Sequence, residues 1–191
     1  MIEKRFNPKN LDKLNNPTRY KTLPPEFIFE KAAIESPEVV IDLGAGTGFY
    51  SKPFAKMHKF SKVYACDISD VMIDWMQKNI SPSYSNIIPL KMEDNVVPLN
   101  DNIADFLFMI NLHHELDNPE KMLDECYRLL KNKGKIAISD WKKEETEQGP
   151  PLEIRYDPIK IKGQLIVSGF KNIKIYSELP DNYLIIAEKK Q

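Results

Sequence analysis

Apolar positions along this chain follow two different spacings. Short runs of consecutive apolar residues, typical of strands buried in a parallel sheet, recur from residue 38 onward. The segments between them carry apolar residues at helical spacing. The predicted strands are 38–43, 62–67, 86–91, 103–110 and 134–141, and the predicted helices are 24–34, 48–58, 69–79, 118–132 and 157–170.

The C-terminal part changes to two strands without a helix between them. The segments 171–179 and 182–190 flank the turn Pro180-Asp181-Asn182, so they are expected to pair antiparallel. Ser69 is a predicted N-cap, and Gly134 after Lys133 is predicted to close the helix 118–132. Alternating strands and helices predict an α/β fold, a doubly wound sheet with helices on both faces.

The four prolines within residues 1–25 indicate an extended or short-helical arm rather than a domain of its own. We expect a single domain over 1–191, with an N-terminal arm and helix in 1–36 and a Rossmann-like core in 37–191.

Composition removes several classes of partner. The formal net charge of the 191 residues is -1, which argues against nucleic acid or an anionic membrane as the main partner. No signal peptide and no membrane-spanning run are visible. Cys66 and Cys126 form no CxxC pair, so buried, reduced thiols and a cytoplasmic location are expected.

The stretch Asp42-Leu43-Gly44-Ala45-Gly46-Thr47-Gly48 follows the first predicted strand of the core. Glycines allow positive φ and a close approach of backbone to a ligand, and the following helix would direct free N–H groups at a carboxylate or phosphate. The spacing G-x-G-x-G differs from the dinucleotide fingerprint and from the triphosphate P-loop. A tight strand–helix turn without a ligand is the alternative interpretation.

A second acidic position supports a nucleoside ligand. Asp67 ends the second strand, nineteen residues after Gly48. A carboxylate there can accept hydrogen bonds from both hydroxyls of a ribose. Its alternative role is to cap the helix that begins near Ser69, and the two roles are compatible.

Four motifs together resemble a known family. VVIDLGAGTGFYS, VYACDIS, PLNDNIADFLFMINLHHEL and CYRLLKNKGKIAISDW are similar, in order and spacing, to the motifs of class I S-adenosylmethionine-dependent methyltransferases, and most of all to the small type 11 group. The resemblance covers about residues 38–141. It implies a seven-stranded sheet of order 3-2-1-4-5-7-6 with an antiparallel last strand and an N-terminal segment over the strand ends.

The same resemblance assigns the methionine end of S-adenosylmethionine to the first and fourth strands. Asp42 would lie near the ammonium group, and Asn111 would face the methionine moiety. Three glycines would pass beneath it, namely Gly44, Gly46 and Gly48.

The adenosine end is assigned in the same way. Asp67 would hold the ribose hydroxyls, and Ile68 would pack on the adenine ring. The family has an acidic residue that contacts the adenine amino group, and the corresponding position in this sequence is Glu93. Asp94 would supply a backbone N–H. Which of the two carboxylates acts stays open.

Catalytic residues are harder to predict, because methyl transfer needs a base only when the acceptor must lose a proton. His114 is the candidate general base, within His113-His114-Glu115 at the end of the fourth strand. Support of the loop beneath the cofactor is the alternative. No H-E-x-x-H pattern is present, so no metal site is expected.

Four further residues are predicted to contact substrate. Arg19 and Tyr20 lie in the arm, which we interpret as a lid, whereas Trp141 and Arg155 flank the charged loop 142–151. The predicted function is S-adenosylmethionine-dependent methyl transfer to a small molecule. An NAD-type oxidoreductase and a catalytically silent cofactor-binding or interaction module are the alternatives, and the oligomeric state is left open.

Overall fold

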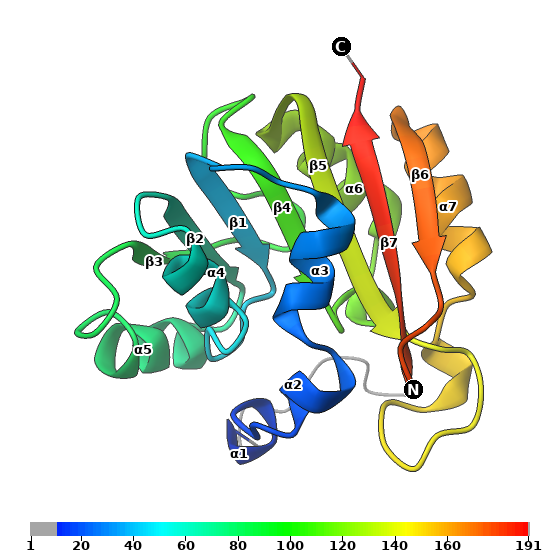
Figure 1. Cartoon of the computed structure of the whole chain (residues 1–191), viewed down its shortest axis with the longest axis horizontal. Coiled ribbons are helices and arrows are strands. Elements are labelled where there is room, and N and C mark those ends of the chain that lie inside the picture. The colour runs from blue at the N-terminus through cyan, green and yellow to red at the C-terminus, as the bar shows by residue number, and fades with distance from the viewer. Residues whose placement is uncertain (1–10, 191) are drawn as a thin grey trace.

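The strands form one seven-stranded sheet of order β3-β2-β1-β4-β5-β7-β6 (Figure 1). This computed structural model describes residues 11–190. β7 runs antiparallel to both of its neighbours, whereas the other pairs are parallel. The predicted strand order and antiparallel last strand are confirmed. The strands are β1 (Val39–Leu43), β2 (Lys62–Asp67), β3 (Ile87–Lys91), β4 (Ala104–Ile110), β5 (Leu130–Trp141), β6 (Phe170–Tyr176) and β7 (Asn182–Lys189).

The order of the strands reverses between β1 and β4. β1 leads to β2 on one side, while β4 pairs with its other side in a register that sets Leu43 opposite Met109. Ligands of such sheets bind outside the carboxyl ends of the strands at this switch point. The glycine loop after β1 and the histidines after β4 therefore meet at one edge of the sheet.

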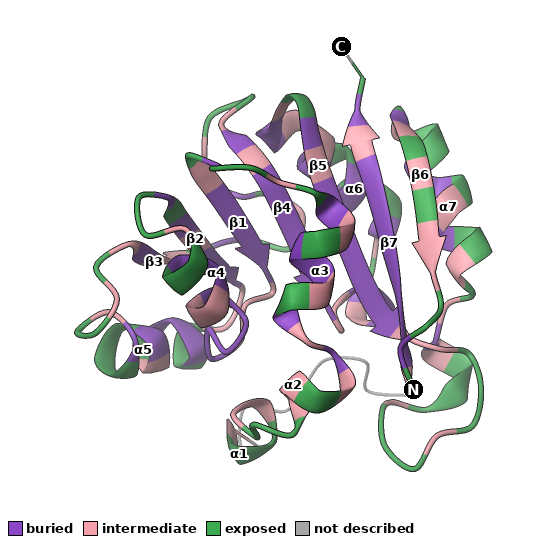
Figure 2. Ribbon diagram, in the orientation of Figure 1, coloured by how far each residue is buried: buried purple, intermediate pink, exposed green. Residues whose placement is uncertain are grey.

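Helices cover both faces of the sheet, as the alternating pattern predicted. On one face α3, α4 and α5 bury side chains such as Ile28, Phe54 and Met76, and on the other α6 and α7 bury Leu123 and Leu165. Figure 2 shows the central strands almost wholly buried, whereas β6 and α7 carry exposed residues. These helices are α3 (Pro25–Ala32), α4 (Ser51–Met57), α5 (Asp70–Asn79), α6 (Pro119–Leu129) and α7 (Pro158–Val167).

The end of α6 corrects one prediction. The helix ends at Leu129 and β5 begins at once with Leu130, so Gly134 does not cap it. The positive φ of 64° belongs to Lys133. Gly134 instead allows a close backbone approach, because a Cβ there would lie 2.8 Å from the carbonyl oxygen of Lys131. The bulge where β5 joins β4 imposes this geometry.

The arm forms two short helices, α1 (Leu11–Leu14) and α2 (Arg19–Thr22), near the carboxyl ends of the central strands (Figure 1). The first ten residues of the predicted arm lie outside the described residues. Ser69 occupies the predicted N-cap of α5, but its side chain makes no capping bond. None of the described helices is long and apolar enough to cross a membrane.

Candidate functional site

The glycine loop adopts a backbone that ordinary side chains avoid. The φ angles are +70° at Gly44, +56° at Gly46 and +68° at Gly48. A Cβ on Gly44 would lie 2.6 Å from the side chain of Leu112, and one on Gly46 would lie 3.2 Å from that of Leu14. The loop therefore runs bare between the β4 turn and the arm, which suits a ligand held by backbone.

Asp42 lies beneath this loop and is buried. The hydroxyl of Ser51 donates to its Oδ2 at 2.6 Å. Burial raises the pKa of Asp42 to about 7, although the Ser51 hydrogen bond opposes the shift. A cation brought to this carboxyl would favour its ionised form, so the predicted position beside an ammonium group is chemically consistent.

Asp67 connects the end of β2 to the glycine loop. Its Oδ2 accepts from the Gly46 N–H at 2.8 Å, and its Oδ1 accepts from the Ser69 N–H at 2.8 Å. Burial raises the pKa of Asp67, and these backbone donors oppose that shift only in part. Each carboxylate oxygen keeps a further lone pair, so the group can still accept two hydroxyl protons.

The predicted adenine residues lie at the same edge of the sheet. Ile68 is half-buried, and its carbonyl oxygen accepts from Nζ of Lys91 at 2.7 Å. The segment after β3 is joined to Asp67 through the N–H of Met92, which donates to the Asp67 carbonyl oxygen at 3.0 Å. Glu93 and Asp94 follow and are exposed, so which carboxylate reads adenine stays a prediction.

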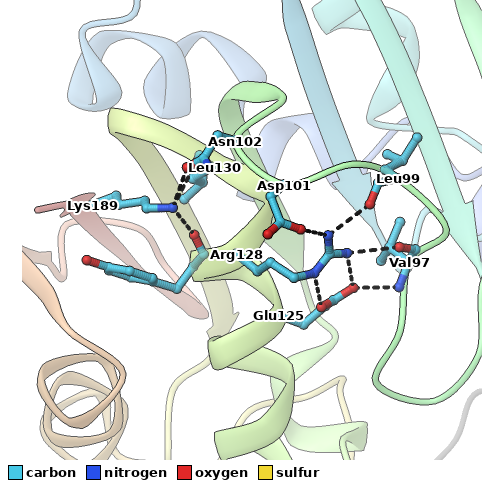
Figure 3. A network of polar contacts seen from close by, with 9 residues as sticks. Val97, Leu99, Asp101, Asn102, Glu125, Arg128, Leu130 and Lys189 are labelled. Carbon is cyan, nitrogen blue, oxygen red and sulfur yellow. Dashed lines mark hydrogen bonds and ion pairs between the residues drawn. The ribbon is translucent and has the colours of Figure 1, made fainter. Parts of the chain in front are cut away.

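Sequence analysis missed the polar network that holds the loop after Glu93. Figure 3 shows Arg128 of α6 with its guanidinium between this loop and Glu125. It donates to both Glu125 oxygens at 2.7 Å and to the carbonyl oxygens of Val97 and Leu99 at 3.1 and 2.9 Å. Glu125 in turn accepts from the Val97 N–H at 2.7 Å.

Asn111 marks the end of β4. It has a φ of +54°, its N–H donates to the Ser139 carbonyl oxygen at 2.8 Å, and its Oδ1 accepts from Nδ2 of Asn182 at 2.7 Å. The next residue, Leu112, contacts the glycine loop at Gly44. The turn that carries the histidines therefore begins against the predicted cofactor loop.

His114 is buried and bonded to an acid at the end of β5. Its Nδ1 lies 2.7 Å from Oδ1 of Asp140, and its backbone N–H donates to Oδ2 at 3.0 Å. Burial opposes charging of the imidazole, but the charge and hydrogen bond of Asp140, with Glu115, together raise the pKa of His114. Asp140 was not predicted, although a lone acid after the apolar run IAIS was a visible signal.

His113 has a different environment from its neighbour. Its Nε2 lies 3.0 Å from Oε1 of Gln164, whose amide nitrogen donates to Glu120 at 2.8 Å. The ring packs edge-to-face on Tyr156 with centroids 5.0 Å apart, and burial lowers the pKa of His113. His113, in η2 (His113–Glu115), is thus joined to α7 through Gln164 and onward to Glu120 of α6.

A pocket of about 220 Å³ opens beside His114, between the end of β5 and the start of α7. It includes Tyr156, whose ring packs on His113. Several of the residues that line it carry charged side chains. The lining residues are His114, Lys143, Glu153, Ile154, Arg155, Tyr156, Asp157 and Lys160.

Arg155 organises the loop 142–151 from its centre. The guanidinium donates to the carbonyl oxygens of Lys142, Glu144, Gln148 and Pro150 at 2.9–3.3 Å. It also lies over the Trp141 ring, 5.6 Å from the centroid. Arg155 itself lines the pocket, and Trp141 lies behind it. The substrate role predicted for these two residues stays a prediction.

Arg19 and Tyr20 attach the arm to the segment after the glycine loop. The Tyr20 ring stacks on Phe49 at 4.1 Å, and its hydroxyl donates to the Phe49 carbonyl oxygen at 2.6 Å. Arg19 lies 5.1 Å from the ring centroids of Phe49 and Tyr50. The arm is thus packed on the glycine-loop side of the site, and its action as a substrate lid stays a prediction.

Comparisons with known proteins identify the family. A model of the methyltransferase domain, Methyltransf_11, matches residues 41–138. The fold is similar to the crystal structure of an S-adenosylmethionine-dependent methyltransferase from Aquifex aeolicus, with a TM-score of 0.91 and 33% identity over 96% of this chain and 99% of that chain.

Two curated relatives are more distant. One is the tRNA(Phe) (4-demethylwyosine(37)-C(7)) aminocarboxypropyltransferase of Methanocaldococcus jannaschii, 28% identical over 80% of this chain and 59% of that protein. The other is the ubiquinone/menaquinone biosynthesis C-methyltransferase of Hydrogenovibrio crunogenus, 27% identical over 60% of this chain and 46% of that protein. The chain thus spans about half the length of these two relatives.

The site fits the cofactor of that family, because a bare, left-handed glycine loop is hydrogen-bonded directly to a buried carboxylate. Among the described residues, no cluster of side chains could hold a metal ion. The family match also decides against the oxidoreductase alternative. This chain belongs to the class I methyltransferases of the type 11 group, whose cofactor is S-adenosylmethionine.

Proposed function

We propose that this protein transfers the methyl group of S-adenosylmethionine to a small molecule bound in the pocket beside His114. The pocket volume of about 220 Å³ is enough for a small acceptor. The net charge of -1 likewise offers little attraction for tRNA. We therefore do not propose tRNA, the substrate of the aminocarboxypropyltransferase relative, as the substrate of this protein.

Different residues of this chain would bind different parts of the cofactor. Backbone of the glycine loop and Asp42 would hold the methionine end, with Asn111 on its other side. Asp67 would accept from the ribose hydroxyls, while Ile68 and Glu93 would contact adenine. The bound cofactor supplies an electrophilic methyl group, so the protein's main task is to position the acceptor and exclude water.

One observation carries this proposal. The Asp67 carboxylate accepts from the Gly46 N–H, so the acid predicted for the ribose and the loop predicted for the methionine end form one rigid surface. A buried acid with a raised pKa beside a bare loop is typical of a functional site, which supports a ligand role beside its bond to the Ser69 N–H.

Calorimetric titration with S-adenosylhomocysteine tests the assignment. Asp67→Ala should lose about 1.5–3 kcal/mol of binding free energy, the usual scale for hydrogen bonds to a charged group. Asp70→Ala is the matched control, because this exposed acid lies three residues away and pairs with Lys91. Thermal melting of each variant checks that it is folded. Equal affinities of wild type and Asp67→Ala would remove Asp67 from the site.

A further inference from the structure

The Asp140 carboxylate is fixed on several sides. It is 1% exposed on β5, directly opposite Tyr183 of β7. Oδ1 lies 2.7 Å from His114 Nδ1 and also accepts from the Trp141 N–H at 2.8 Å, while Oδ2 accepts from the His114 N–H at 3.0 Å. The backbone and the ring of His114 are thus bound by the same acid.

This contact determines which nitrogen of His114 carries the proton. A carboxylate oxygen only accepts, so Nδ1 carries the hydrogen in the neutral ring and Nε2 keeps its lone pair. Among residues 11–190, the charged oxygen nearest to Nε2 is on Glu115, 3.8 Å away, which is too far for a hydrogen bond. Because His114 is one of the residues that line the pocket, Nε2 is the ring nitrogen left to meet a bound acceptor.

We infer that Asp140 is a positioning residue that makes His114 a general base for an acceptor that must lose a proton, and we assign that acceptor as a hydroxyl group. This inference rests on the proposed function. Asp140 holds the ring in one tautomer and stabilises it once it is protonated. A neutral amine attacks with its own lone pair, whereas a hydroxyl must release its proton as its oxygen attacks.

The proposed step balances without a further reactant. The acceptor oxygen forms a bond to the methyl carbon, the bond from that carbon to sulfur breaks, and its electron pair stays on sulfur as a neutral thioether. The hydroxyl proton passes to Nε2 of His114, so the ring becomes an imidazolium paired with Asp140. The products are a methyl ether and S-adenosylhomocysteine, and the proton leaves to solvent.

The charges around His114 decide how this base responds to pH. Asp140 and Glu115 favour the protonated ring, whereas burial and Arg155 disfavour it, with a raised pKa as the net result. His113 packs on Tyr156 at the neighbouring position. The other charged groups at the pocket are Lys143, Glu153, Asp157 and Lys160. Activity should rise with pH through the His114 pKa, and Asp140→Asn should move that rise to lower pH.

Imidazole NMR on the ligand-free protein tests the dyad directly. The ¹⁵N spectrum of wild type should show His114 with its proton on Nδ1, and its pKa should fall in Asp140→Asn while that of His58 stays unchanged. A proton on Nε2, or a His114 pKa unaffected by Asp140→Asn, would overturn the positioning role. The wild-type spectrum decides the tautomer even if the variant fails to fold.

The acceptor class has its own test. S-adenosylmethionine labelled with ¹³C on the methyl group is incubated with the protein and a macromolecule-free cell extract, and the labelled products are classified by NMR. A methoxy product that falls about 10²-fold in His114→Asn, with unchanged affinity for S-adenosylhomocysteine, is expected. Labelled N-methyl, S-methyl or C-methyl products would overturn the hydroxyl assignment. No labelled product at all would count against the proposed function itself.

Discussion

Removal of the Arg128 guanidinium should strongly destabilise the protein. Arg128→Met preserves much of the side chain's length. Among residues 11–190, it leaves the 9% exposed side chain of Glu125 with the Val97 N–H as its one remaining partner (Figure 3). Breaking a buried ion pair from one side costs about 3–5 kcal/mol. Because Arg128 is about one third exposed, we expect about 2–4 kcal/mol.

Urea denaturation followed by circular dichroism gives this loss, and melting should fall by roughly 6–12 °C for a loss near 3 kcal/mol. Lys131→Met is the matched control, because that lysine makes only exposed or partly exposed ion pairs with Glu38 and Asp105 and should cost under about 1 kcal/mol.

The double variant Glu125→Gln/Arg128→Met distinguishes an unpaired charge from lost packing. It removes the carboxylate that Arg128→Met strands, so it should be more stable than Arg128→Met alone by about 1–2 kcal/mol. Equal losses in Arg128→Met and Lys131→Met, or a double variant as unstable as the sum of its parts, would refute this reasoning.

Two further variants test other parts of the site. Asp42 has a pKa of about 7 in the folded state against 3.8 as its ordinary value, so its contribution to stability is complete below about pH 4 and is lost as pH rises through 7. Ionisation of Asp42 should lower the unfolding free energy of the wild type by roughly 4 kcal/mol between pH 4 and 8, and Asp42→Asn should remove this loss. If the unfolding free energies of the wild type and the variant fall in parallel over this range, the prediction is wrong. Arg155→Met should free the loop 142–151 and raise its hydrogen exchange, while affinity for S-adenosylhomocysteine stays within about twofold. Unchanged exchange in that loop would show that Arg155 does not hold it.

Local patterns predicted most of the fold. The run KVYACD forms β2 with the predicted bounds, and its terminal Asp67 reaches the glycine loop, because parallel strands bring their carboxyl ends to one edge. The end of α6 was wrong for a physical reason. Helical periodicity continues past Leu129, but pairing of Leu130 with Ala104 extends the chain at that point.

The polar partnerships could not be predicted in the same way. Asp140 lies 26 residues from His114, and Gln164 lies 51 residues from His113. Such pairs produce no periodic pattern in the sequence, because they form only when the fold brings two distant strand or helix ends together. The hydrogen bonds from Arg155 to four loop carbonyl oxygens are a further case, because bonds to backbone do not depend on a pattern of side chains.

A crystal structure with S-adenosylhomocysteine is the most direct test of methyl transfer in the His114 pocket. The ribose hydroxyls should lie on the Asp67 carboxylate, and the thioether sulfur should face the pocket lined by His114 and Tyr156. A bound acceptor would then have room between sulfur and His114 Nε2. A sulfur that faces away from this pocket, or a ligand that does not touch Asp67, would contradict the proposed function.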